Sequence, residues 1–231
     1  MKVQHIKRQA DVILKKQTER DIIMAKGSRG GKRAGGGGGL NPSDILSTRS
    51  LMSERERFQT EVDETMEAFK NVYEEYGLDV EDIQIATLAA KAQSTLAYYD
   101  GANIAFNESF FNKAKMEASY DACVKNGFHP SKGNKTALEA VASHELGHAL
   151  TDKIATKMGV YSLSDAATRV VNEARKQTKH RGVVKMASKI SGYATQSNAE
   201  ALAEAFADVY CNGKKARSES RAIVNVMKKY L

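Results

Sequence analysis

The pattern of hydrophobic and polar residues predicts a few short strands followed by several helices. Apolar side chains recur at helical spacing from residue 50 to residue 76, and Gly77 is well placed to end that helix. Residues 83–87, 94–99 and 103–107 are typical of strands, and Asp100-Gly101 predicts a tight hairpin between the last two. Further helices are predicted over residues 109–125, 136–157, 164–179, 197–212 and 217–229. Strands first and helices later indicate an α+β domain, with helices packed on a small mixed sheet.

The first 42 residues follow a different pattern. Residues 1–26 combine many bases with apolar side chains near helical spacing, which predicts a basic amphipathic leader helix. A solvated, partly ordered leader is an equally open interpretation. Residues 27–42 hold eight of the 17 glycines and predict a flexible linker, because the Gly-Lys-Ser/Thr ending of a phosphate-binding loop is missing. The folded domain is expected over residues 43–231.

The net charge of +7 lies in the leader. Residues 1–34 contain ten Lys or Arg and three acidic residues, whereas the rest of the chain contains 25 of each kind. The leader is therefore a candidate contact for nucleic acid or a larger assembly, and the folded domain is not. No aromatic residue is interleaved among the leader's bases, so stacking on nucleobases is not indicated.

Composition also restricts the compartment. No apolar run approaches the roughly 20 residues that span a bilayer, so no membrane span is expected. The start of the chain lacks the apolar stretch of a secretory signal. Cys123 and Cys211 are far apart, and we expect both to be small buried residues in a reducing, cytoplasmic compartment. A single disulfide between them is the other interpretation.

The segment from His144 to His148, with the sequence His-Glu-Leu-Gly-His, carries the clearest chemistry. It lies in a strongly helical stretch that Thr136 and Glu139 can begin with a capping box. Residues four apart share one helix face, so both imidazoles can converge on one cation, and Glu145 can polarise a water there. Gly147 weakens the helix by about 1 kcal/mol relative to alanine, but permits close packing or substrate approach. Two ordinary surface or core histidines are the alternative interpretation.

A later predicted helix carries acidic residues at matching spacing. Glu200, Glu204 and Asp208 recur every four residues, and almost all residues between them are alanine, leucine or phenylalanine. Such neighbours favour a buried helix over an acidic solvated face. Buried carboxylates need partners, and two metal-binding histidines would supply them.

Together the two segments resemble the zincin metallopeptidases related to the catalytic domain of anthrax lethal factor, which also occur in phages and other mobile elements. The resemblance rests on the HExxH segment and on Tyr193 followed, seven residues later, by Glu200-Ala-Leu-Ala-Glu204. It implies one catalytic Zn²⁺ with three ligands: His144, His148 and Glu200. It further implies that Glu145 is the general base, that Tyr193 stabilises the oxyanion, and that Glu204 hydrogen-bonds a ligand histidine. Ala194 stands where a glycine is familiar in the family.

The function implied is that of a zinc-dependent endopeptidase, which hydrolyses a peptide bond of a protein or peptide substrate through a metal-activated water. Zincins place an edge strand above the active-site helix, and an extended substrate can pair with it. The candidate edge strand comprises Asn103, Ile104, Ala105, Phe106 and Asn107. An ordinary core strand is an equally open interpretation of these residues.

Two other functions remain open from the sequence. One is a catalytically silent zincin-fold protein of a phage particle or mobile element, tethered through its basic leader and found in the host cytoplasm or the virion. The other is a nucleic-acid-binding protein, whose binding would weaken steeply with salt. His5, His129 and His180 stand alone in polar surroundings and are expected at the surface. A cysteine nucleophile is disfavoured, because neither cysteine has a clear histidine partner.

Overall fold

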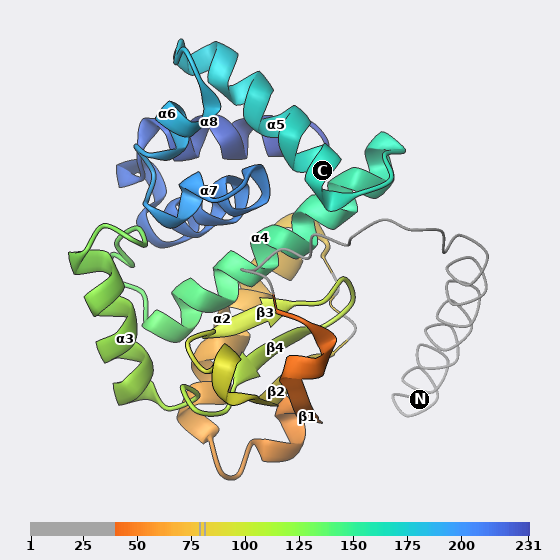
Figure 1. The fold of residues 1–231 in the computed structure, drawn as a ribbon, viewed down its shortest axis with the longest axis vertical. Coiled ribbons are helices and arrows are strands. Elements are labelled where there is room, and N and C mark those ends of the chain that lie inside the picture. The colour runs from red at the N-terminus through yellow and green to blue at the C-terminus, as the bar shows by residue number, and fades with distance from the viewer. Residues whose placement is uncertain (1–39, 79, 81) are drawn as a thin grey trace. The chain divides into compact units, whose positions relative to one another are not determined.

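The computed structural model describes residues 40–78, 80 and 82–231. The predicted leader, residues 1–26, lies outside the described residues, as does all of the predicted linker except residues 40–42. The described chain forms four strands and seven α-helices, which confirms an α+β architecture (Figure 1). The strands are β1 (Ile45–Ser50), β2 (Ile83–Leu88), β3 (Ala97–Tyr99) and β4 (Ile104–Asn107). The helices are α2 (Gln59–Tyr76), α3 (Lys113–Lys125), α4 (Ala137–Met158), α5 (Leu163–Thr178), α6 (Val183–Ala187), α7 (Asn198–Asn212) and α8 (Ser218–Met227).

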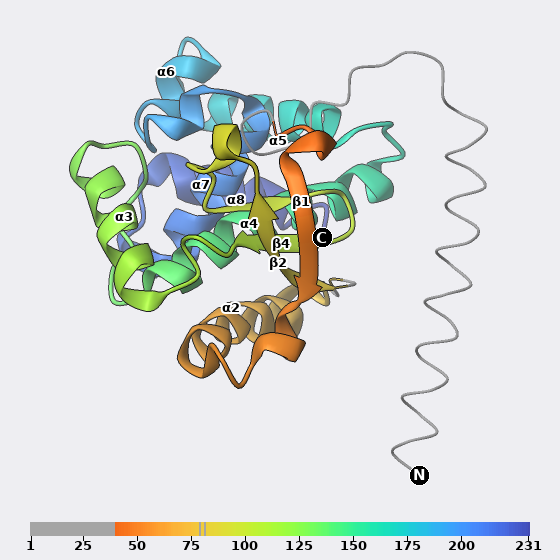
Figure 2. The ribbon, with the colours of Figure 1, turned by 60° about the horizontal axis from the view of Figure 1, so that its bottom comes forward.

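The four strands form one mixed sheet in the order β1-β2-β4-β3. β1 pairs antiparallel with β2, β2 pairs parallel with β4, and β3 and β4 form the predicted antiparallel hairpin. The edges of the described sheet are therefore β1, visible at the outer side in Figure 2, and β3. The prediction that residues 103–107 form the edge strand is wrong, because β4 has a hydrogen-bonded neighbour on each side.

Side chains on the two faces of the sheet enter different clusters. Ile85, Ile104 and Phe106 join the main core together with residues of α2 and α4. Ala105 and Tyr98, which alternate with them, belong to a smaller cluster on the opposite face. This is the period of two that places neighbouring strand residues on opposite faces. The face that carries the main core is therefore the one on which the helices lie (Figures 1 and 2).

Helix α4 runs through the middle of the described chain. In Figure 1 the sheet and α2 lie on one side of it, and α5, α7 and α8 lie on the other. Every residue from Ala137 to Leu150 is buried, which is typical of a helix enclosed by neighbours on all sides. None of the described helices is long and apolar enough to cross a membrane.

Local sequence signals position the ends of these elements as predicted. Gly77 ends α2 in the left-handed conformation, at φ 58°. Thr136 and Glu139 form the capping box that begins α4, with each side chain accepting from the other residue's backbone N–H. In the β3–β4 hairpin, the Asp100 carboxylate accepts from the backbone N–H groups of Ala102 and Asn103.

Three elements differ from their prediction. The helix predicted from residue 50 is divided into a 3₁₀ turn, Leu51–Glu54, and α2, which starts at Gln59. β1 was not predicted, because its side chains are exposed or half-buried and show no hydrophobic alternation. α6 was also missed, since its five residues are too short for a helical period to appear.

Gly147 lies where α4 packs closely against α7. A Cβ atom at this position would lie 2.9 Å from Cα of Ala203 and 3.3 Å from Cβ of Phe206. The first contact is with backbone, which cannot rotate away as a side chain can. Of the two roles predicted for Gly147, the structure supports close packing, and this packing brings α7 against the histidines of α4.

We expect Gly147→Ala to destabilise the protein although alanine is the better helix former. Overpacking of a tight contact costs about 1–3 kcal/mol, which outweighs the gain of about 1 kcal/mol in helix propensity. Thermal unfolding should therefore show a clear fall in Tm. Gly182→Ala is the control, because nothing lies within 4 Å of a Cβ there. An unchanged Tm for Gly147→Ala would mean that α4 and α7 can move apart without loss of folding free energy.

Candidate metal centre

The three predicted ligands come together from two helices. His144 and His148 lie one turn apart on α4, and Glu200 lies in the first turn of α7. The Ser197 side chain caps α7 by accepting from the backbone N–H of Glu200, at 3.1 Å. The local signal that starts α7 therefore also fixes the position of the acidic residue. The histidines are presented by an enclosed helix and the glutamate by a capped one.

The distances between the three side chains suit one cation. Oε2 of Glu200 lies 3.2 Å from Nε2 of His144 and 3.4 Å from Nε2 of His148. All three ligand atoms lie within 4.8 Å of one another. In a tetrahedral site with bonds of 2.0–2.1 Å, donor atoms are separated by about 3.3 Å. The described residues therefore contain a group that could hold a metal ion.

Burial and charge favour a cation at this position. His148 is fully buried, and its Nδ1 has no hydrogen-bond partner among the described residues. Burial acts to lower the pKa of His144, but Glu200 and Glu204 raise it well above its usual value. Burial acts to raise the pKa of Glu200, but the two histidines lower it far more. A negative cluster that draws a proton onto histidine can draw a metal cation in its place.

Glu204 connects the ligand His144 to two further side chains. Its Oε1 lies 2.9 Å from Nδ1 of His144 and 3.0 Å from Nδ1 of His129. Its Oε2 accepts a hydrogen bond of 2.7 Å from the buried hydroxyl of Ser191. Burial acts to raise the pKa of Glu204, but the two histidines lower it to about 2. An ionised Glu204 can fix the ring orientation of His144, which is the role that second-sphere carboxylates have at metal sites.

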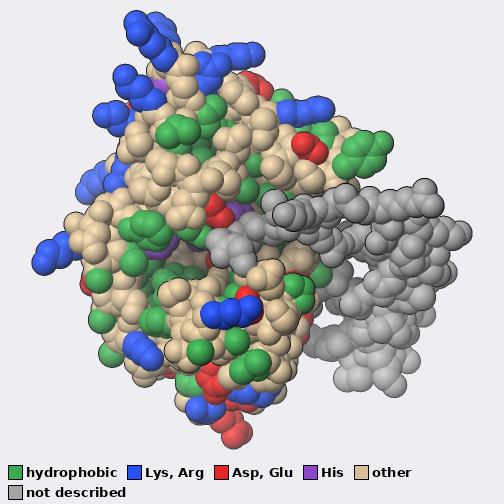
Figure 3. All heavy atoms as spheres, viewed as in Figure 1, with side chains coloured by type: hydrophobic (Ala, Val, Ile, Leu, Met, Phe, Trp, Pro, Cys, Tyr) green, Lys and Arg blue, Asp and Glu red, His purple; other side chains and the backbone are tan. Residues whose placement is uncertain are grey.

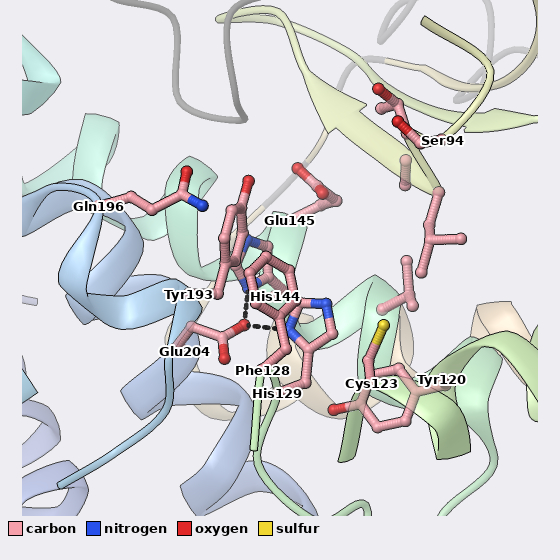
Figure 4. A pocket seen from close by; sticks show the side chains of 14 residues that line it. Ser94, Tyr120, Cys123, Phe128, His129, His144, Glu145, Tyr193, Gln196 and Glu204 are labelled. Carbon is pink, nitrogen blue, oxygen red and sulfur yellow. Dashed lines mark hydrogen bonds and ion pairs between the residues drawn. The ribbon is translucent and has the colours of Figure 1, made fainter. Parts of the chain in front are cut away.

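A pocket of about 500 Å³ opens beside the ligands. Its lining includes His144, Glu145, Tyr193 and Glu204, and it reaches to residues 94–97 at the edge strand β3. Tyr193 stacks on the His144 ring, with ring centroids 5.6 Å apart and planes inclined by 28°. Figure 4 shows the Tyr193 hydroxyl and the Glu145 carboxylate directed toward the same side of the pocket. The Tyr193 ring therefore faces the site although alanine, and not glycine, follows it.

Glu145 is buried at the boundary between the ligands and the pocket. Its Oε2 has no hydrogen-bond partner among the described residues. Burial raises the pKa of the Glu145 carboxyl, and Glu200 and Glu204 add to this, while the two histidines oppose it. A carboxyl group whose charged form is disfavoured accepts a proton readily, which is what a general base requires.

His129 is a site residue that the sequence did not indicate, and its assignment to the surface is wrong. Its ring is only 13% exposed and lines the pocket. It stacks on Tyr120, with centroids 5.4 Å apart and planes inclined by 4°. No motif marks it, because it comes from the loop between α3 and α4. Two backbone hydrogen bonds connect this loop to the segment that carries Tyr193. The N–H of Gly192 donates to the carbonyl of Gly127 at 2.8 Å, and the N–H of Tyr193 donates to the carbonyl of Phe128 at 3.0 Å.

Asp208 and His180 both lie outside the metal centre. Asp208 shares the spacing of Glu200 and Glu204, yet its carboxylate accepts from Ser220, Asn212 and the backbone N–H of Arg217. Asp208 therefore fixes the start of α8 and contributes nothing to the metal centre. His180 pairs with Glu219 at 2.9 Å, so it is half-buried and structural, although it was expected to stand alone at the surface.

The cysteines fit no thiolate chemistry. Both are free and partly buried, so the described structure has no disulfide between them. Cys123 lines the pocket, as His129 does. Burial raises the pKa of the Cys123 thiol and raises that of Cys211 to about 12. Because the thiolate is the nucleophilic form, a cysteine nucleophile stays disfavoured although Cys123 and His129 share a pocket.

Taken together, the side chains make a three-ligand centre beside a pocket that one of the ligands, His144, lines. A structural zinc site is normally closed by four protein ligands, whereas a catalytic one keeps a position for water. The described residues offer a group of three: His144, His148 and Glu200. Comparison of the chain with protein-family models, with curated proteins and with solved structures found no match.

Proposed function

We propose that the protein is a zinc-dependent endopeptidase of the zincin type. The observation that carries the proposal is a three-residue ligand group beside a pocket that one ligand, His144, lines together with Glu145 and Tyr193. A site that only bound metal would not need an acidic side chain and a tyrosine at the open position. The two histidines and the glutamate are ligand types that zinc prefers. When bound, zinc would supply a water of lowered pKa and a Lewis acid for the scissile carbonyl.

The chain's own residues would then perform three tasks in hydrolysis. Glu145 would take a proton from the attacking water and pass it to the leaving amine as the C–N bond breaks. Tyr193 would donate a hydrogen bond to the oxyanion that forms on the carbonyl oxygen. Glu204 would hold the ring of His144 through Nδ1, at the observed 2.9 Å.

The proposed peptide substrate would lie along β3. This strand is an edge of the described sheet, and residues 94–97, which lead into it, line the pocket. An extended peptide can add to such an edge by main-chain hydrogen bonds. β3 therefore replaces β4 as the candidate substrate strand.

The proposal is tested by metal analysis of the purified protein combined with cleavage of an unbiased peptide library. We expect about one zinc per chain, and cleavage products that disappear with a chelator and return with added zinc. Metal without cleavage at any position would favour the catalytically silent structural protein. A protein without metal would contradict both.

We expect Tyr193→Phe to lower kcat/KM by about 10²-fold, which is the usual loss when one oxyanion donor is removed. Metal content should not change, because phenylalanine can keep the stacking on His144. Peptide cleavage at matched zinc content measures the effect. Tyr161→Phe is the control, since Tyr161 is fully exposed and outside the pocket. Equal activity of the two variants would remove Tyr193 from the mechanism.

A further inference from the structure

The loop that carries His129 is fixed on both sides. Gly127 and Phe128 accept backbone hydrogen bonds from the segment of Tyr193, and the Phe128 N–H donates to Cys123 O at 2.8 Å. The next residue, Pro130, is buried, and its carbonyl accepts from the Tyr120 hydroxyl at 3.1 Å. The backbone at His129 is therefore held in place by the rest of the domain.

The imidazole ring itself has one determined orientation. Tyr120 covers one face in a parallel stack, and Phe128 and Tyr193 make edge contacts, with centroids 5.1 Å and 5.3 Å away. Nδ1 lies 3.0 Å from the Glu204 carboxylate. An acceptor-only partner requires the proton on Nδ1, so the neutral ring presents the lone pair of Nε2 on its other side.

That second nitrogen is directed into the pocket, away from Glu204 (Figure 4). No described residue hydrogen-bonds to it. The pocket lining includes the apolar side chains of Leu96, Ala97 and Val141. An acceptor beside apolar side chains gives a ligand hydrogen bond more weight, because water competes for it less.

We propose that His129 is a specificity-determining residue, whose Nε2 accepts a hydrogen bond from a substrate side chain that enters this pocket. The side chain that fits has an apolar stem and a neutral donor at its end, as glutamine, asparagine and threonine do. The inference rests on the proposed peptide substrate. A purely hydrophobic pocket would instead favour methionine, leucine and valine, which are of similar size to these side chains but lack the donor.

Matched substrates test the proposal in the full-length, zinc-loaded protein. Three peptide pairs differ only at the pocket-facing position: glutamine against methionine, asparagine against leucine, and threonine against valine. We expect the wild type to prefer the donor member by about two- to tenfold in kcat/KM, the usual weight of one neutral hydrogen bond. In His129→Phe, which can keep the ring stack, the ratio should fall to one or below. The ratio within a pair is independent of the fraction of active protein, so general damage does not imitate the effect.

His180→Phe is the matched control, because it also removes a histidine bound to a glutamate, at 2.9 Å, but outside the pocket. It should keep the wild-type ratio. A wild-type ratio of one, or a ratio that survives in His129→Phe, would overturn the inference.

A binding measurement separates this inference from the proposed peptidase function. A random peptide library displayed on phage is selected on zinc-loaded wild type and on His129→Phe. Enrichment of donor side chains by the wild type alone, without any cleavage, would support the role of His129 and reject the peptidase. Cleavage without donor preference would support the peptidase and reject the role of His129. Neither cleavage nor enrichment would reject both.

Discussion

Replacement of Glu145 by glutamine is expected to lower kcat/KM for peptide cleavage by about 10²–10⁴-fold, the range attributed to general acid–base groups. Glutamine has almost the same shape but cannot accept the proton. Glu145 is buried, and burial raises the pKa of its carboxyl, so the charged form is already disfavoured and the neutral amide should be tolerated there. The variant should therefore fold and keep its metal.

Cleavage is compared at matched zinc content, so that a loss of metal cannot imitate a loss of the base. Glu74→Gln removes an equal charge from the exposed surface of α2 and should have no effect. Substantial cleavage by Glu145→Gln would exclude Glu145 as the base. A loss of zinc in the same variant would show that Glu145 helps to hold the ion.

The two helices of the metal centre could be predicted because their signals are local. The capping box begins α4 at Thr136, and the four-residue spacing of His144 and His148 places both on one helix face. Ser197 caps α7 in the same way. Each of these features involves residues within one or two helical turns, where sequence separation and spatial distance correspond.

The order of the strands could not be predicted in this way. The hairpin signal at Asp100-Gly101 shows that β3 and β4 are neighbours, but it does not reveal which of them has a second partner. β2 pairs with β4 across a parallel register that no local pattern records. The edge strand was therefore predicted wrongly, because the edge of a sheet depends on how all of its strands pair.

His129 and Ser191 illustrate the same limit within the site. Both contact Glu204, but His129 comes from a loop before α4, and Ser191 precedes the Tyr193 segment. Neither belongs to a spaced motif. Only the packing of the loops against each other places them around one carboxylate.

The formal neutrality of residues 35–231 also concealed an uneven distribution of charge. Residues 174–231 contain twelve Lys or Arg and four acidic residues, and three of those four acids are buried. In Figure 3, Lys and Arg side chains gather at the end of the domain formed by α5 and α6. Truncation of residues 1–34 alone would therefore not test nucleic-acid binding by the whole chain. The interaction predicted for the leader stays a prediction.

Zinc-loaded protein is expected to unfold at a markedly higher temperature than protein treated with a chelator. Without a cation, the Glu145, Glu200 and Glu204 carboxyls lie buried in the α4–α7 region, close to one another. A metal at about a thousandfold excess over its Kd stabilises the folded state by roughly 4 kcal/mol. In a protein of this size that corresponds to a rise in Tm of roughly 8–16 °C.

Two variants of α7 decide whether the ligand group produces this rise. Glu200→Ala should abolish the zinc-dependent increase, because it removes a ligand. Asp208→Asn should lower the Tm of the chelated and zinc-loaded protein alike, since Asp208 holds the start of α8, yet the increase itself should remain. Calorimetry with and without zinc measures both. An increase that persists in Glu200→Ala, or is lost in Asp208→Asn, would place the metal away from His144, His148 and Glu200.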